Sequence, residues 1–384
     1  MERRGYLQIP GPTNVPPRIL RSLSLPLINH RGPEFEALVE NCILELKSVF
    51  RTNNDILMIP SSGSGGLESA IVNLFSPGDT IAVACHGLFS ERVSVIAEKY
   101  GVHVVKIEKE WGESIKAADI ETVLLHDREF KIKAVFVPQN ETTSGITNDI
   151  ESIGKMMMHS GHSALLIVDV VSSLACLPFE MDLWGVDVAV TASQKGFMLP
   201  PGLSMIAIGK RAWRMSESST LPKWYWDYKA MKLKLEEFQM PYTPPTTLLF
   251  GLKESLEILR EEGLENVWSR HALMAQATRN AAVAMGLSLF SETGFESDTV
   301  TAINMPEGIA FKTFSEKIKQ NYGVVLGGGL QKLQGKIFRV GHMGSIHKLD
   351  IYAIMGAIEM TLYELGYEVE LGVSSKAITE TFLK

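Results

Sequence analysis

The sequence predicts an α/β protein whose large domain has a mainly parallel seven-stranded sheet and whose smaller C-terminal domain is α+β. First, short apolar runs rich in Val and Ile alternate with helical patterns along most of the chain. Such runs are typical of strands buried on both faces, and their alternation with helices is typical of parallel sheets. Second, this alternation changes past about residue 250, and the length of 384 residues fits one large and one smaller domain.

The elements of the large domain follow in chain order. Residues 1–17 are rich in Pro and Gly and predict an extended N-terminal arm, because Pro lacks the backbone donor that helices and inner strands use. The large domain is expected over 18–260, and it begins with a helical pattern at 34–50. The expected strands are 56–59, 81–85, 103–107, 134–138, 165–171, 187–193 and 203–209, with helices at 66–75, 90–100 and 149–160.

The smaller domain is expected over 261–384. Two helical stretches, 248–262 and 264–286, lead into it. The pattern that follows is an alternation of strands and helices, with strands at 299–305 and 336–343 and helices at 311–322 and 348–366.

Composition excludes several classes of protein. A hydrophobic content of 45% and a charged content of 21% allow a sizeable core and exclude a disordered chain. A net charge of −7 argues against a nucleic-acid-binding protein. We find neither an apolar segment of about 18 residues nor a secretory signal, so no membrane association is expected. Three separated cysteines without a CxxC pair predict reduced thiols, no thiolate zinc site and a cytoplasmic location.

A Gly- and Ser-rich loop follows the first expected strand. Residues 60–66 read Pro-Ser-Ser-Gly-Ser-Gly-Gly and lead into a helix. Small residues let the backbone approach an anion, and the free N–H groups of the helix N-terminus then face it. The loop matches neither the mononucleotide nor the dinucleotide fingerprint. A phosphate site is the functional interpretation, and a flexible capped turn is the alternative.

Two residues after later strands fit one heterocyclic cofactor. Asp169 ends the run LLIVD, and a buried carboxylate there needs a partner such as a protonated pyridine nitrogen. Lys195 follows the next strand, where burial would lower its pKa as a Schiff-base lysine requires. A capping or metal-binding role for Asp169 and a solvated surface position for Lys195 are the alternatives.

Arg339 lies within an expected strand of the smaller domain. A charge there needs a partner, and a guanidinium matches a carboxylate in bidentate fashion. The functional interpretation is a grip on a substrate carboxylate, and the alternative is a structural ion pair. We recognise no second arginine suited to a dicarboxylate side chain.

With these residues the chain resembles the class V, fold-type I aminotransferases. It is most similar to the serine–glyoxylate and alanine–glyoxylate (serine–pyruvate) branch, from the Pro-Gly-Pro at residue 10 to about residue 367. The matching segments are Ser62-Gly63-Ser64-Gly65, Leu67-Glu68-Ser69-Ala70, Ser76-Pro77-Gly78-Asp79, Asn140-Glu141-Thr142-Thr143-Ser144-Gly145, Val168-Asp169-Val170-Val171-Ser172-Ser173, Gly185-Val186-Asp187, Ser193-Gln194-Lys195, Pro200-Pro201-Gly202, Pro241-Tyr242-Thr243-Pro244 and Phe338-Arg339-Val340-Gly341-His342.

The resemblance implies a pyridoxal 5'-phosphate enzyme without a metal. Lys195 would hold the cofactor as a Schiff base and then move a proton as general base and acid. Asp169 would pair with the pyridine nitrogen, and Arg339 would grip the substrate carboxylate. Small amino acids and 2-oxo acids would be the substrates, with serine or alanine as donor and glyoxylate or pyruvate as acceptor.

The resemblance also implies the remaining cofactor contacts. Ser62, Gly63 and Ser64 would bind the phosphate with Gln194 beside it. Phe89 would stack on the ring, at a position where some relatives carry Trp, and Thr142 would contact the phenolic oxygen. Thr243 would reach the phosphate of a neighbouring subunit, which implies a homodimer with shared active sites.

Other activities share this scaffold. Aminotransferases with a specialised donor, such as ureidoglycine or pyridoxamine, are the nearest alternative. Ser64 stands where animal alanine–glyoxylate enzymes carry His, so the choice of donor stays open. A class V lyase or desulfurase is less favoured, because Cys42, Cys85 and Cys176 lie in apolar or strand patterns. A binding protein without cofactor is disfavoured by the presence of Lys195, Asp169 and Arg339 together.

Overall fold

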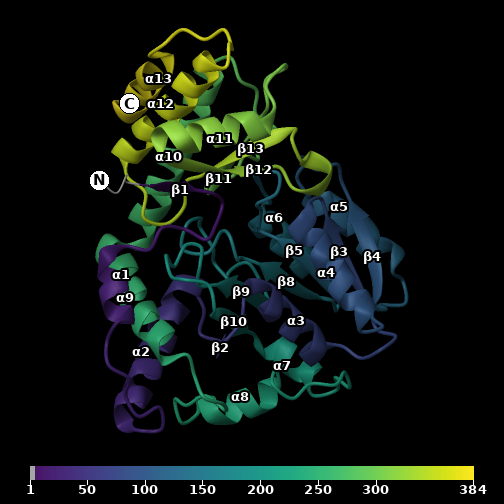
Figure 1. The fold of residues 1–384 in the computed structure, drawn as a ribbon. Coiled ribbons are helices and arrows are strands. Elements are labelled where there is room, and N and C mark those ends of the chain that lie inside the picture. Colours follow the sequence, from purple (N-terminus) through teal and green to yellow (C-terminus); the bar gives the residue numbers. More distant parts are fainter. Residues whose placement is uncertain (1–4) are drawn as a thin grey trace.

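The protein is described by a computed structural model over residues 5–384, which has one large and one smaller sheet (Figure 1). The large sheet has seven strands in the order β2-β10-β9-β8-β5-β3-β4. Its strands are β2 (Asp55–Ile59), β3 (Thr80–Cys85), β4 (His103–Glu108), β5 (Ile132–Pro138), β8 (Leu165–Asp169), β9 (Val188–Ala192) and β10 (Ser204–Ile208). The expected seven-stranded sheet is confirmed.

The strands are parallel except for β10, which runs antiparallel to both of its neighbours, β2 and β9. Because β2 and β9 are both antiparallel to β10, they run in the same direction as each other and as the other strands. The carboxyl ends of six strands therefore lie at one edge of the sheet. The strand expected over 165–171 ends at Asp169, where the carboxylate accepts the Val171 N–H at 2.8 Å and turns the chain out of the sheet.

Helices cover both faces of the large sheet. The helices of this domain are α1 (Pro17–Leu23), α2 (Pro33–Phe50), α3 (Gly63–Leu74), α4 (Leu88–Lys99), α5 (Ala117–His126), α6 (Ile150–Ser160), α7 (Lys210–Ser216), α8 (Tyr228–Leu235) and α9 (Thr246–Glu262). A short hairpin of β6 (Asn140–Glu141) and β7 (Ile146–Thr147) follows β5. The apolar side chains of α2, α5 and α6 share one cluster, and those of α3 and α4 share the cluster on the opposite face.

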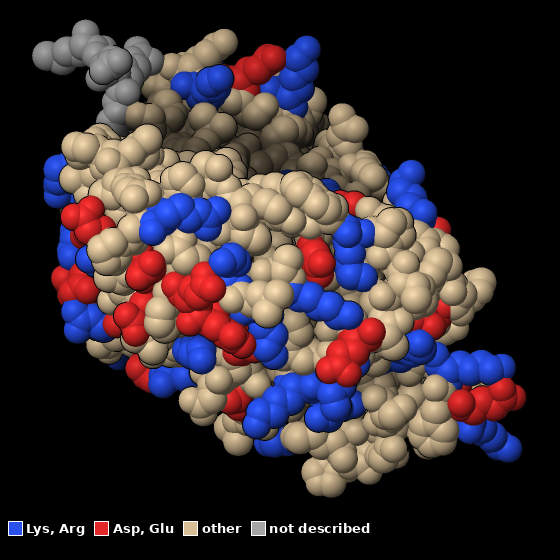
Figure 2. Space-filling view, turned by 90° about the horizontal axis from the view of Figure 1, so that it is seen from below, with Lys and Arg blue, Asp and Glu red and all other residues tan. Residues whose placement is uncertain are grey.

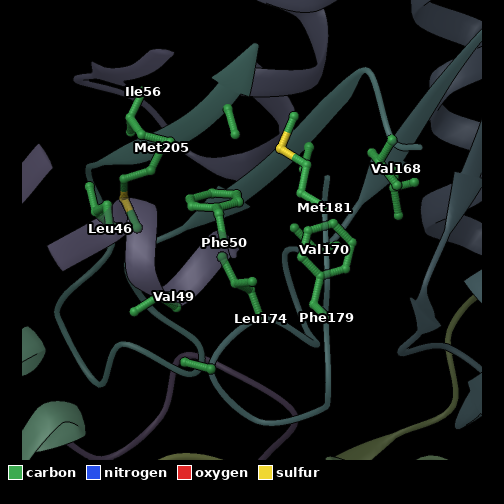
Figure 3. Close-up of a cluster of buried hydrophobic side chains, with 14 of the residues drawn as sticks. Leu46, Val49, Phe50, Ile56, Val168, Val170, Leu174, Phe179, Met181 and Met205 are labelled. Atoms are coloured by element: carbon green, nitrogen blue, oxygen red, sulfur yellow. The ribbon is translucent and has the colours of Figure 1, made fainter. Parts of the chain in front are cut away.

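Alternate residues of the strands point into these two clusters, except on the edge strand β4, where most side chains are exposed. On β2, for example, Ile56 and Met58 belong to one cluster, and Leu57 and Ile59 belong to the other. Figure 3 shows the first cluster, in which the end of α2 meets side chains of β2, β8 and β10. This alternation explains why the strands are continuous apolar runs, since both faces of the sheet are buried.

The smaller sheet has the order β1-β12-β13-β11, and the C-terminal helices pack on it (Figure 1). Its strands are β1 (Tyr6–Gln8), β11 (Val300–Asn304), β12 (Val324–Gly328) and β13 (Ile337–Gly341), and its helices are α10 (Leu264–Ala284), α11 (Phe311–Tyr322), η1 (Gln331–Leu333), α12 (Lys348–Glu364) and α13 (Val373–Phe382). Residues 6–8 of the N-terminal arm thus form a strand parallel to β12. We keep 18–260 and 261–384 as proposed domain bounds.

The surface carries no single-sign patch on the face shown in Figure 2, where Lys and Arg are interspersed with Asp and Glu. Among residues 5–384, none of the helices has the length and apolar character needed to cross a bilayer.

Candidate active site

Loops after five strands converge on one cavity. It has a volume of about 290 Å³ and lies at the carboxyl ends of β2, β3, β5, β8 and β9. This is the edge at which open α/β sheets bind their ligands. The lining residues are Ser62, Gly63, Ser64, Leu67, Phe89, Arg92, Asn140, Thr142, Asp169, Val171, Ser172, Gln194 and Lys195.

One end of the cavity is formed by the start of α3. Ser62 is the N-cap, but its side chain makes no capping hydrogen bond, so the first N–H groups of the helix lack a side-chain acceptor. Close packing fixes this turn, since a side chain at Gly66 would begin 2.2 Å from Ser204 Oγ. Nearby, the buried Gln194 Oε1 has no hydrogen-bond partner among the described residues. The free N–H groups of this helix start fit an anion such as a phosphate. The Gln194 oxygen is an acceptor and needs a donor instead.

Asp169 and Lys195 lie on the wall of the same cavity. Burial raises the pKa of Asp169 to about 6, although the Val171 N–H opposes this shift. Burial, and next the charge of Arg339, lower the pKa of Lys195 to about 8. An acid that is costly to ionise needs a cationic partner, and an amine with a lowered pKa is a better nucleophile near neutrality.

The N-terminal arm covers the lysine. Lys195 Nζ donates to the Pro10 carbonyl, and Thr13 Oγ1 donates to the Lys195 carbonyl at 3.1 Å. Gly11 has a φ of +120°, and a side chain there would begin 2.5 Å from Lys195 Nζ. The arm therefore passes the amine so closely that only glycine fits at residue 11.

Arg339 lies outside the lining but beside it. On β13 it is buried, and its Nη1 donates to the carbonyl of the lining residue Thr142 at 3.0 Å. Nε and Nη2 both donate to the Gly328 carbonyl, at 3.1 and 2.8 Å. A guanidinium has five N–H groups, so one on each Nη is left, which is the geometry of a bidentate carboxylate site. Burial lowers the pKa of Arg339 to about 10, so the group is still charged at neutral pH.

Eight of the ten residues expected at the site line the cavity: Ser62, Gly63, Ser64, Phe89, Thr142, Asp169, Gln194 and Lys195. Arg339 contacts this set through Thr142. Thr243 is exposed and does not line the cavity, so its contact with a neighbouring subunit stays a prediction.

The sequence analysis missed Arg92, although this arginine lines the cavity. The expectation that no second arginine is suited to a dicarboxylate side chain stays a prediction, because lining the cavity does not show what Arg92 binds. Its position three residues after Phe89 on α4 was a usable signal, because residues at this spacing share a helix face. The other lining residues that were missed flank residues already singled out, and they are Leu67, Asn140, Val171 and Ser172.

A buried carboxylate joins two of the loops. Glu141 is fully buried and accepts the N–H groups of Ser90 and Thr143, both at 2.9 Å. These residues adjoin Phe89 and Thr142. Glu141 thus fixes the spacing between the aromatic ring and the threonine on the cavity wall.

The buried histidines have structural partners. His342 bonds to Thr301 at 2.8 Å and His271 accepts the Gly344 N–H at 2.9 Å, and burial lowers the pKa of these imidazoles to about 3 and about 4. Within residues 5–384, no group of three or more His, Cys, Asp or Glu side chains is placed to hold a metal ion.

The fold and this arrangement of loops are those of the fold-type I enzymes that depend on pyridoxal phosphate. Residues 6–347 match the family described as Aminotransferase class-V. The chain belongs to the class V aminotransferases, and its cofactor is pyridoxal 5'-phosphate.

Individual relatives cover nearly the whole chain. It is 39% identical to a serine–glyoxylate aminotransferase of Methylorubrum extorquens, over 99% of this chain and 96% of the relative. It is 38% identical to an L-aspartate–glyoxylate aminotransferase of Paracoccus denitrificans, over 100% of this chain and 97% of the relative. A solved ureidoglycine–glyoxylate aminotransferase of Bacillus subtilis superimposes with a TM-score of 0.93 at 26% identity, covering 100% of this chain and 99% of the other.

Proposed function

We propose that this aminotransferase moves the amino group of serine or alanine to glyoxylate or pyruvate. The observation that carries the proposal is the arrangement of the two arginine side chains at the cavity. Arg339 has two N–H groups left for one carboxylate, whereas Arg92 is directed towards the start of α3 by its hydrogen bond to Ser64 at 2.8 Å. A substrate with one carboxylate and a short side chain fits this arrangement, and two relatives named above use glyoxylate with serine or aspartate.

The residues around the cavity would divide the work. When bound, pyridoxal phosphate supplies an aldehyde that holds the amino group and a ring that takes up the electrons released at the substrate Cα. Lys195 would hold the aldehyde covalently and, once displaced by substrate, carry the proton to and from Cα. Asp169 would accept a hydrogen bond from the pyridine nitrogen and keep it protonated. The raised pKa of Asp169 supports this role, because a cationic partner would restore its charged form.

Other residues would position the cofactor and the substrate. Ser62, Gly63, Ser64 and Gln194 would bind the phosphate, which the uncapped helix start supports. Phe89 would stack on the ring, and offset stacking contributes about 0.5–1.5 kcal/mol beyond burial.

On the substrate side, Thr142 would contact the phenolic oxygen, and its carbonyl meanwhile orients Arg339. We further propose a homodimer in which the exposed Thr243 reaches the partner's phosphate. We propose a cytoplasmic location on the basis of three free, buried thiols.

Half-reactions with single donors test the proposal. Purified enzyme is mixed with serine, alanine or aspartate, and the cofactor spectrum is followed. Serine or alanine should convert the cofactor fastest, and aspartate converting fastest would refute the donor assignment. In Lys195→Ala, turnover should fall by at least about 10²–10⁴-fold, the range of acid–base catalysis, and borohydride should no longer fix the cofactor to the chain.

A specialised donor is the second candidate, because solved aminotransferases for ureidoglycine and for pyridoxamine share this fold with TM-scores of 0.93 and 0.92. Ureidoglycine and pyridoxamine added to the same assay would reveal it. A desulfurase is disfavoured, because it needs an accessible thiolate, whereas burial raises the pKa of Cys42 and Cys176 to about 12.

A further inference from the structure

The phosphate end of the cavity lacks an assigned cation. Its side chains, Ser62, Ser64 and Gln194, are neutral. A phosphate monoester carries a charge of about −1.5 to −2 at neutral pH, and enclosing it without a counter-charge is costly. Among the described residues that line the cavity, the cationic side chains are Lys195 and Arg92. Lys195 is committed to the aldehyde, which leaves Arg92.

Arg92 lies where it can supply this charge. It is on the first turns of α4, and its Nη1 donates to Ser64 Oγ at 2.8 Å. Its Cζ lies 4.9 Å from the centre of the Phe89 ring, a cation–π contact that holds the guanidinium beside the ring. No carboxylate of the described chain pairs with Arg92 within 4.0 Å, so its charge has no counter-ion from within residues 5–384.

The bond to Ser64 also orients a second donor. Because the Ser64 hydroxyl accepts from Arg92, its own hydrogen points elsewhere and can be donated to an oxygen in the cavity. Hydrogen bonds in such a chain strengthen one another, and the charge of the guanidinium makes the hydroxyl a better donor. Arg92 thus acts on the start of α3 both as a charge and through Ser64.

We propose that Arg92 is the cation that balances the cofactor phosphate, and that Arg92 and Ser64 together form a positioning pair for it. The inference rests on the proposed cofactor site and deepens it. The competing assignment for Arg92 is the second carboxylate of an acidic donor. The geometry favours the phosphate, since Arg92 is bonded to the first turn of α3, whereas the carboxylate site belongs to Arg339 on β13.

The test compares two cofactor forms that differ only in the phosphate. Pyridoxal phosphate and pyridoxal are titrated into the apoenzyme and followed by protein fluorescence, for the unsubstituted chain, Arg92→Gln, Arg92→Lys and the control Arg128→Gln. Arg128 is exposed and does not line the cavity. Arg92→Gln should raise the Kd for pyridoxal phosphate about 10- to 100-fold, the range of a lost charge-assisted hydrogen bond, and change that for pyridoxal less than about twofold. Arg92→Lys should recover part of the affinity, and Arg128→Gln should match the unsubstituted chain.

A second measurement needs no cofactor. Inorganic phosphate should raise the Tm of the unsubstituted apoenzyme and of Arg128→Gln, but not that of Arg92→Gln. Equal weakening of pyridoxal and pyridoxal phosphate would overturn the proposal, because Arg92 would then act only through Phe89. Unchanged pyridoxal phosphate affinity with a higher KM for aspartate alone would also overturn it. If the unsubstituted apoenzyme bound neither form, the proposed function itself would fail.

Discussion

The two ends of the active-site cavity are built in different ways. The phosphate end consists of the short loop and first turn of α3, and Arg92 reaches it from the next helix. The carboxylate end depends on Arg339 of the smaller sheet bonding to Thr142 of the large domain, 197 positions earlier in the sequence. The phosphate end is therefore built next to a single sheet, whereas the carboxylate end requires the two sheets to be correctly positioned relative to each other.

Under the proposed function, this difference would separate the residues that hold the cofactor from those that select the substrate. The phosphate end has free donors before any ligand is bound. At the carboxylate end, three of five guanidinium N–H groups are already used by backbone carbonyls. The arginine is thus fixed in orientation in advance, and little conformational freedom is lost when a carboxylate binds to it.

Among the variants that separate the two ends of the cavity, Arg339→Lys is expected to have the largest effect on activity. The ammonium keeps the charge but loses the planar pair of donors, so kcat/KM for the donor should fall about 10- to 100-fold. The affinity of the apoenzyme for pyridoxal phosphate should stay within about twofold, because the substitution is at the other end. A matching loss of cofactor affinity would mean that the two ends are not separable.

The substitution Gly11→Ala is expected to affect Lys195, which lies on the cavity wall between the phosphate end and the carboxylate end. A methyl group at residue 11 would begin 2.5 Å from Lys195 Nζ, and a φ of +120° is unfavourable for alanine. The lysine should be displaced, and the rate at which the apoenzyme captures pyridoxal phosphate should fall about tenfold or more. Gly335→Ala is the matched control, because it also has a positive φ but no atom within 4 Å of the added carbon. If both variants captured the cofactor equally slowly, backbone conformation alone would account for the loss.

The smallest effect is on stability and depends on pH. Burial raises the pKa of Asp169 to about 6 from 3.8, so the folded apoenzyme favours the protonated acid. As pH rises from about 4 through 6 the proton is lost, and the unsubstituted apoenzyme loses stability that Asp169→Asn keeps. The Tm of Asp169→Asn should therefore exceed that of the unsubstituted chain by about 2–4 °C at pH 7 and by less at pH 4. A difference that is constant over this pH range would contradict the assigned cause.

The sequence predicted the elements in which several consecutive residues are buried. The strands of the large sheet were predictable because both faces are covered, which gives unbroken apolar runs such as 165–169. It was less informative for β1 and β12, which are short and contain or adjoin glycine and proline. These strands exist because they pair with each other across more than three hundred residues, a fact that no local pattern expresses.

The same distinction holds at the site. Asp169 and Lys195 could be predicted because each follows a buried strand at the ligand-binding edge. Arg92 could not be assigned in the same way, because its bond to Ser64 depends on how α3 and α4 pack. The carbonyl partners of Arg339 were equally hidden, since backbone groups have no sequence signature.

The N-terminal arm has a consequence for how the enzyme is made. Tyr6 pairs with Val324, and a side chain at Gly341 would begin 2.3 Å from the Ile9 carbonyl oxygen. Residues 6–11 therefore settle over Lys195 only once β12, more than 300 positions later, is available for pairing. The wall beside the Lys195 amine is completed only after β12 has been synthesised, so a nascent chain that stalls before residue 324 cannot complete this wall.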